Sequence, residues 1–439
     1  MYRSYFRIAR NGAVLALVAG VLMASAADDP FERPPISYST TAPQNAISGL
    51  QEKLAAGKIR LEGDEKQVLR SLLTALNISE TSQVLVFSKT SLQRDLIDPA
   101  HPRALYFSDD VYVGWCPGGL AEVAAIDPVL GPVFYKFDPR AAKTKPLFER
   151  DPDCLRCHGG AFVRDIPGLL ARSVYTDATG EPMSALGSEL VDSTTPFERR
   201  YGGWYVTGLN GAIRHRGNVV LKDNRAPTDA ELARGNNVKS LSAFFDTRPY
   251  LSETSDLVAL LVFEHQVTVQ NVLTKANQHC LSLMAYQQGV QRDLKERVTD
   301  EPTFESVDNA FADAVQQVLD ALLSKDEAAL PEGGVKGIGG FAEAFGRQAR
   351  GAADGRTLKD LDLQRRVFKY RCSYLVQSPS FDRLQPALRK RVLRRLWRVL
   401  SDPSSDRRYA YLEPEERQAI RRIVGSTVSN LPPNWEKDR

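Results

Sequence analysis

Cysteine, histidine and methionine are scarce in this sequence. The 439 residues include five cysteines, five histidines and four methionines. A small and odd set of cysteines excludes a disulfide scaffold, so the fold must be stabilised by the packing of apolar side chains. Cys116, Cys280 and Cys372 stand far apart in the sequence and allow at most one disulfide and a leftover thiol.

Long apolar runs are missing except at the N-terminus. Residues 1–30 read MYRSYFRIARNGAVLALVAGVLMASAADDP, with an apolar stretch from Gly12 to Met23 that ends in small residues. This pattern is typical of a secretory signal peptide, and the stretch is short for a membrane span. We therefore predict a signal peptide over residues 1–26 and a periplasmic protein. Membrane association is expected only if this segment stays uncleaved.

A strong net charge of either sign is also missing. The formal charge is +3, and loss of Arg3, Arg7 and Arg10 with the signal peptide brings it to about zero (+3 − 3). Overall charge therefore indicates no class of partner. We expect no nucleic-acid partner, because a nucleic-acid-binding protein is not normally exported.

The apolar pattern predicts an α+β fold with three regions after the signal peptide. Residues 27–82 read as a loose, proline-dotted leader followed by two helices, the second capped by Asp64. Residues 83–251 are predicted to be rich in strands, because short β-branched and aromatic runs alternate with turns: QVLVFS, ALYFS, VYVGW, AEVAAI and PVFYKF. Residues 252–439 are predicted to be mainly helical, starting with one long helix or two abutting helices.

Three finer features follow from the same reading. The stretch GGWYVTGLNGAIRHRGNVVL, residues 202–221, is a candidate hairpin that turns at Asn210-Gly211. A glycine-rich segment over 331–355 is typical of a mobile connector. Amphipathic patterns predict helices near 361–376, 384–400 and 413–427.

Two of the five cysteines lie together in ERDPDCLRCHGGAFVRD, residues 149–165. Cys154 and Cys157 are followed directly by His158. A zinc site is disfavoured, because adjacent side chains point apart and no second cysteine pair exists. Thiol–disulfide exchange is possible but gives the histidine no role. Covalent haem attachment gives all three residues a role: two thiols add to the porphyrin vinyl groups, and the histidine binds the iron.

This stretch resembles the haem attachment motif of the c-type cytochromes, with Cys154, Cys157 and His158 filling C-x-x-C-H. The resemblance implies one covalent haem c on the two cysteines and iron bound by the histidine. It also implies that attachment is completed outside the cytoplasm, which agrees with the predicted signal peptide. The resemblance covers about ten residues. It does not imply the small cytochrome fold, because the motif lies between strand-like segments of a much larger chain.

The sixth iron ligand has four candidates: His215, His265, Met183 or none. In IRHRGNVV, strand alternation would place His215 on an apolar face and Arg214 and Arg216 on the other face, where arginines can pair with haem propionates. His265 lies in an apolar seam of the predicted long helix. Met183 follows the motif in a predicted turn.

The sequence therefore predicts an exported c-type haem protein. Two protein ligands on the iron favour electron transfer, which requires a redox partner protein. An open sixth position favours a haem enzyme that acts on peroxide or oxygen, with Glu264, His265 or Arg216 in the distal pocket, or a haem-based sensor.

Overall fold

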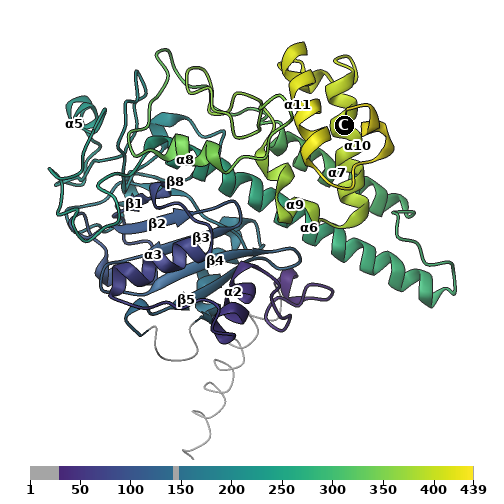
Figure 1. Ribbon diagram of the computed structural model, residues 1–439, viewed down its shortest axis with the longest axis horizontal. Coiled ribbons are helices and arrows are strands. Elements are labelled where there is room, and N and C mark those ends of the chain that lie inside the picture. Colours follow the sequence, from purple (N-terminus) through teal and green to yellow (C-terminus); the bar gives the residue numbers. More distant parts are fainter. Residues whose placement is uncertain (1–28, 142–147, 439) are drawn as a thin grey trace, which may run out of the picture.

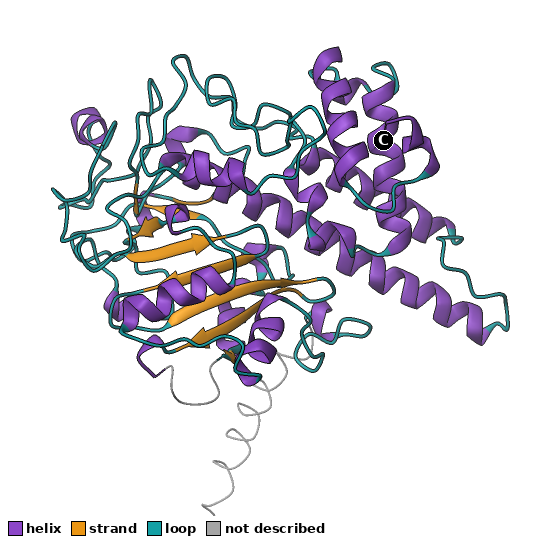
Figure 2. Cartoon of the chain, in the orientation of Figure 1, coloured by secondary structure: helices purple, strands orange, loops and turns teal. Residues whose placement is uncertain are grey.

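An antiparallel sheet of seven strands forms the centre of the molecule (Figures 1 and 2). The computed structural model describes residues 29–141 and 148–438, so the predicted signal peptide lies outside the described residues. The strand order is β6-β5-β4-β3-β2-β1-β9. The strands are β1 (Val84–Val86), β2 (Arg103–Phe107), β3 (Val111–Trp115), β4 (Ala121–Asp127), β5 (Gly131–Phe137), β6 (Glu149–Arg150) and β9 (Trp204–Tyr205). All five predicted strand runs are confirmed, and β7 (Arg172–Val174) and β8 (Ser188–Leu190) form a separate pair.

The two faces of the sheet belong to different parts of the core. Neighbouring residues on a strand point to opposite faces, so alternate side chains sort into two sets. One set packs with the helical half of the chain: Phe107, Tyr112, Ala124, Ile126 and Phe134. The other set packs with the N-terminal helices: Tyr106, Val113, Trp115, Val123, Val133 and Tyr135. The sheet is therefore covered on both faces.

Two short helices cover the N-terminal side of the sheet, where Figure 1 shows them in front of the strands. They are α2 (Ala46–Ala55) and α3 (Glu65–Ala75), and the second begins after Asp64, as predicted. The leader that precedes these helices is not loose, which corrects the prediction from the sequence. Phe31, Ile36 and Tyr38 are buried against the same core, and the Tyr38 hydroxyl donates to the Pro132 carbonyl oxygen over 2.9 Å.

One long helix, α6 (Leu257–Asp293), packs against the other face of the sheet. Asp256 caps it by accepting hydrogen bonds from the amides of Val258 and Ala259. The C-terminal helices share a core with α6, and Figure 1 shows α7, α10 and α11 together at the upper right and α8 nearer to the sheet. They are α7 (Glu305–Leu322), α8 (Phe341–Arg347), α9 (Pro379–Asp382), α10 (Pro386–Ser401) and α11 (Pro414–Thr427). The α+β class, with strands in the middle region and helices towards the C-terminus, is confirmed.

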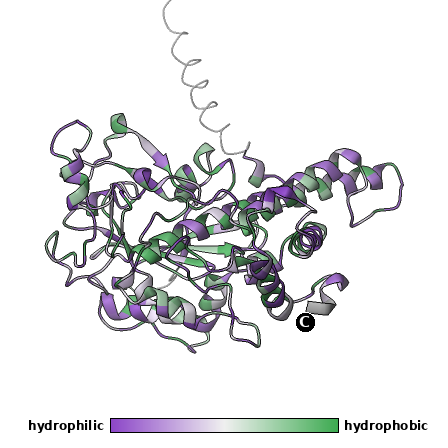
Figure 3. Cartoon of the chain, turned by 90° about the horizontal axis from the view of Figure 1, so that it is seen from above, coloured by the Kyte–Doolittle hydropathy of each residue, from purple (hydrophilic) through white to green (hydrophobic). Residues whose placement is uncertain are grey.

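Helix α6 is apolar on most of its circumference. In the part of the chain that the structure describes, it is the one helix long and apolar enough to cross a membrane, but most of that apolar stretch is buried inside the fold. Figure 3 shows the apolar part of the ribbon gathered at the centre, with hydrophilic segments around it. This is the arrangement of a core helix with partners on all sides.

Three finer predictions are wrong. Residues 206–221 form no hairpin, and only Trp204–Tyr205 of the predicted stretch is a strand, paired with β1. The 331–355 segment is not a loose connector, because it contains α8, whose Phe341 and Phe345 are buried. Residues 361–376 form no helix beyond a short 3₁₀ turn that begins at Tyr374.

Candidate functional site

The cysteine-histidine motif forms a short helical turn beside strand β5. A 3₁₀ turn over Pro152–Cys154 leads into helix α4 (Leu155–His158). The Asp151 carboxylate accepts a hydrogen bond from the Asp153 amide, and Pro152 occupies the first helical position, where its missing N–H costs nothing. The Asp151 amide donates to the Phe134 carbonyl oxygen over 3.1 Å. These bonds fix the start of the motif to the sheet.

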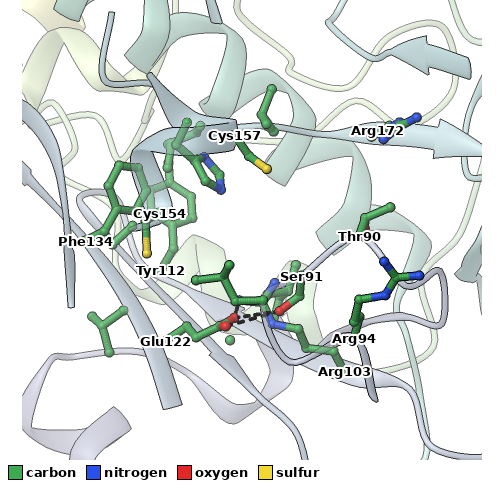
Figure 4. Close-up of a pocket in the computed structure, with 18 of the residues that line it drawn as sticks. Thr90, Ser91, Arg94, Arg103, Tyr112, Glu122, Phe134, Cys154, Cys157 and Arg172 are labelled. Atoms are coloured by element: carbon green, nitrogen blue, oxygen red, sulfur yellow. Dashed lines mark hydrogen bonds and ion pairs between the residues drawn. The ribbon is translucent and has the colours of Figure 1, made fainter. Parts of the chain in front are cut away.

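A cavity of about 380 Å³ lies between this motif and the sheet. Figure 4 shows Cys154 and Cys157 on one side and Arg103, Glu122 and Ser91 on the opposite side. The volume falls in the usual range for small-molecule sites. The apolar part of its wall comes from both halves of the chain: Leu105, Tyr112, Ala124, Phe134, Leu169, Leu170 and Phe263.

The His158 ring lines this cavity in an orientation suited to metal binding. Its Nδ1 lies 2.8 Å from the Gly168 carbonyl oxygen, and the Gly168 amide donates back to the His158 carbonyl oxygen over 2.8 Å. A proton on Nδ1 makes this bond and leaves the Nε2 lone pair free. Burial lowers the pKa of His158, which favours the neutral imidazole that metals bind. The Phe134 ring packs against it, with ring centres 4.7 Å apart.

The carbonyl that orients His158 is held by helix α6. The Asn271 side chain accepts from the Leu169 amide and donates to the Leu169 carbonyl oxygen, both over 2.8 Å. A Cβ atom at Gly168 would lie 2.8 Å from the Val163 side chain, so this position requires glycine. Asn271 is therefore a positioning residue for the imidazole, acting through Gly168 and Leu169.

The two thiols differ in exposure. Cys154 is half-buried, Cys157 is exposed, and both are free. Burial raises the pKa of the Cys154 thiol to about 12, and the charge of Asp151 adds to the effect. Exchange centres need a cysteine with a lowered pKa, so its environment disfavours Cys154 as the attacking thiol of thiol–disulfide exchange. Residues 29–141 and 148–438 contain no group of three or more His, Cys, Asp or Glu side chains able to hold a metal ion.

The lining of the cavity fits a flat apolar group with an anionic edge, such as haem. Cys154, Cys157 and His158 line the cavity together with aromatic and aliphatic side chains, and Lys89, Arg94 and Arg172 are also among the lining residues. Arg94 is 2.8 Å from the Glu181 carboxylate, while the Arg172 Nε donates to the Ser188 hydroxyl over 2.7 Å. These cations can pair with carboxylates, as a haem propionate requires.

The opposite wall carries residues that the sequence reasoning missed. Arg103 forms an ion pair with Glu122, whose carboxylate also accepts a hydrogen bond from the Ser91 hydroxyl over 3.1 Å. The sequence held a signal for Glu122, which is a charged residue inside the apolar strand run AEVAAI, whereas Arg103 directly precedes the run ALYFS. Only the register of β2, β3 and β4 brings the two charges together.

His215, a predicted candidate for the sixth iron ligand, is not among the residues that line the cavity. It is buried, its Nδ1 accepts a hydrogen bond from the Gly217 amide over 3.1 Å, and its ring packs edge-on against Tyr201. The expectation assumed strand alternation, whereas this segment is irregular. Arg214 and Arg216 are absent from the lining too: Arg214 lies 3.5 Å from Asp229, and Arg216 stacks on the Tyr175 ring.

His265 and Glu264 also lie outside the lining of the cavity. His265 is buried, as its apolar seam predicted, but it faces the C-terminal region, where its Nε2 is 2.9 Å from the Ser373 hydroxyl. Glu264 is buried in an ion pair with Arg200, at 2.7 Å. Many side chains of helix α6 are buried, and they point in different directions. The apolar surroundings of His265 therefore did not indicate that it faces this cavity.

The other sulfur side chains do not reach the cavity wall either. Met183 packs in a small cluster with Tyr175, although its neighbour Pro182 lines the cavity. Cys116, Cys280 and Cys372 are buried free thiols and form no disulfide. Among the described residues of the lining, His158 is therefore the only histidine, and there is no methionine. No known protein family, curated protein or solved structure matches this chain.

Proposed function

We propose that this chain is an exported protein with one covalent haem c, attached through Cys154 and Cys157, with His158 as the axial ligand of the iron. The observation that carries the proposal is the position of His158: its Nδ1 lies 2.8 Å from the Gly168 carbonyl oxygen, its Nε2 has no hydrogen bond to any residue that the structure describes, and its side chain lines the same cavity as both thiols. A bound haem would supply an iron that changes oxidation state and can bind small molecules. Export and a redox partner protein belong to the same proposal.

We further propose that the haem iron binds a small molecule. The protein would then be either an enzyme that acts on peroxide or oxygen, or a haem-based sensor. Electron carriers of this type have two strong protein ligands, whereas the described lining contains one histidine and no methionine. The wall that faces the motif carries the charged pair Arg103–Glu122 instead. Apolar side chains from β2, β3, β5 and α6 would exclude water from the ring, and Asn271 would hold the axial imidazole through the loop at Gly168.

Haem attachment is tested by expressing the full chain in a host with c-type maturation enzymes, denaturing it and looking for colour that stays with the polypeptide. The wild type should stay coloured, because thioether bonds survive denaturation. Cys154→Ser with Cys157→Ser should be colourless, and Cys372→Ser, which removes a buried thiol far from the motif in sequence, is the matched control. A colourless wild-type chain refutes the proposal.

The open sixth position is tested by adding carbon monoxide to the reduced, purified protein. Rapid binding with a shift of the absorption spectrum is expected. A spectrum that carbon monoxide leaves unchanged would mean that a protein group occupies the position, and electron transfer would then be the better function.

A further inference from the structure

The C-terminal end of helix α6 projects beyond the helices that pack on the rest of it. Figure 1 shows this end at the lower right, where a loop returns the chain to α7. All seven residues from Arg292 to Val298 are exposed. Leu294 and Val298 are 62% and 42% exposed, although apolar side chains of this size are usually buried. This tip, residues 290–298, therefore presents apolar surface that the fold of one chain does not cover.

The tip is nevertheless held in a fixed conformation. Two buried glutamines of α6, Gln287 and Gln291, bind the segment that returns to α7. The Gln287 side chain accepts from the Thr303 amide over 2.8 Å, and the Gln291 side chain accepts from the Thr299 amide over 3.0 Å. The Glu296 amide donates to the Gln291 carbonyl oxygen over 2.8 Å. A segment fixed in this way loses little conformational entropy when it binds a partner, which favours binding.

The charges of the tip are mixed in sign and form no ion pair with other residues that the structure describes. They are Arg292, Asp293, Lys295 and Glu296, and they sum to zero (2 − 2). Arg292 and Glu296 have the spacing of an ion pair on a helix, but α6 ends at Asp293 and leaves them apart. A membrane surface or a partner with one strong sign of charge would favour a tip of the opposite sign. The tip therefore fits a partner whose charges are equally mixed.

The order of these charges is inverted about Leu294. Arg292 and Asp293 precede Leu294, and Lys295 and Glu296 follow it. When two copies of one segment meet antiparallel across a twofold axis, residues at equal distances from the axis come close to one another. With the axis at Leu294, Arg292 of one copy meets Glu296 of the other, and Asp293 meets Lys295. The tip is thus complementary in charge to a second copy of itself.

We propose that this tip is a self-association surface, and that its partner is a second copy of this chain in a twofold dimer. Leu294 of each copy lies at the axis, and Val290 of one copy packs near Val298 of the other. Both kinds of ion pair occur twice and surround this apolar centre, as the polar rim does in protein interfaces. The inference does not depend on the haem, because the tip is not part of the cavity lining.

Sedimentation equilibrium of the purified protein measures the self-association. We expect a dimer in equilibrium with monomer, with a Kd below about 100 μM, because a small interface typically binds in the micromolar range. Leu294→Asp should weaken the dimer about 30-fold or more, because it places two like charges at the axis. Arg422→Glu reverses an exposed cation on α11 and is the matched control, whose Kd should equal that of the wild type. A wild-type protein that stays monomeric up to this concentration refutes the proposal.

Charge reversal tests which residues meet. Arg292→Glu leaves an acid at both positions of this pair, and Glu296→Arg leaves a cation at both. Each variant alone should dimerise at least about tenfold more weakly than the wild type, since like charges then meet twice. An equal mixture of the two variants should regain the wild-type affinity, because every acid of one variant then meets a cation of the other. The double variant, with both changes on one chain, should also regain it.

The mixture distinguishes a contact between copies from a contact within one chain, because mixing cannot repair an ion pair inside a single chain. A mixture as weakly associated as its two components, beside a dimeric wild type, would mean that the copies meet elsewhere and would refute the proposed surface. The haem proposal has a separate test, the colour of the denatured chain. A colourless chain that dimerises as expected refutes the haem and supports this inference.

Discussion

The buried histidine on helix α6 makes the protein sensitive to acid in a way that one substitution can isolate. His265 is buried among Phe368, Tyr374 and Ser373, and burial lowers its pKa from 6.5 to about 4. An unfolded chain binds a proton on this ring at about pH 6.5, whereas the folded chain stays neutral until about pH 4. The stability that comes from keeping the ring neutral is therefore present above pH 6.5 and is lost as the pH falls towards 4.

The size of the effect follows from the two pKa values. The difference between 6.5 and about 4 corresponds to about 3 kcal/mol of unfolding free energy, at 1.36 kcal/mol for each pH interval of one. Carboxyl groups act in the opposite sense: burial raises the pKa of Asp110 to about 6 and that of Glu327 to about 7, so both favour the folded state as the pH falls. The total pH dependence is thus a sum, and only a comparison of variants isolates the histidine.

His265→Gln is the informative variant, because glutamine keeps a polar group near Ser373 but does not titrate. Urea unfolding followed by far-UV circular dichroism gives the unfolding free energy of each protein between pH 7 and pH 4. The wild type should lose about 3 kcal/mol more than His265→Gln over this range. Parallel curves for the wild type and His265→Gln would refute the reasoning.

Three further variants test the packing around the site. Asn271→Ala leaves both main-chain groups of Leu169 unpaired and should lower the unfolding free energy by about 2 kcal/mol; in the proposed haem protein it should also broaden the absorption spectrum, which a purely structural role would leave unchanged. Arg200→Met should cost about 3–5 kcal/mol in thermal unfolding because it leaves the Glu264 carboxylate buried without a cation, with only the Tyr201 hydroxyl as a hydrogen-bond donor, and adding Glu264→Leu should recover most of the loss. His158→Ala should keep covalent colour but change the absorption spectrum, and an unchanged spectrum would mean that the iron is bound elsewhere.

The sequence predicted those elements whose pattern is local. The five strand runs and helices α2, α3, α10 and α11 follow from apolar periodicity and from caps such as Asp64. The hairpin predicted around His215 is wrong because Gly208, Gly211 and Asn218 adopt positive φ angles. These angles interrupt extended backbone, so side chains along the segment do not alternate between two faces.

Only the wall of the cavity that carries the cysteine-histidine motif could be predicted from the sequence. Cys154, Cys157 and His158 are adjacent in sequence, so their joint position needs no knowledge of the fold. Arg103 and Glu122 meet through the register of three strands, and Asn271 reaches the motif from a helix more than a hundred residues away in sequence. No local pattern contains such pairings, because they depend on how distant segments pack.

Helix α6 also determines how the molecule can come apart. Its apolar side chains belong to one continuous core with the sheet residues Tyr112 and Phe134 and with α7 and α10. Cutting the chain after residue 293 would strip the partners from one side of α6 and expose its apolar surface, so the strand-rich part is not expected to survive as a fragment. The sheet has a second core with α2 and α3 on its other face, but both cores share the strands, so loss of the α6 contacts should destabilise the whole chain and a single calorimetric transition is expected.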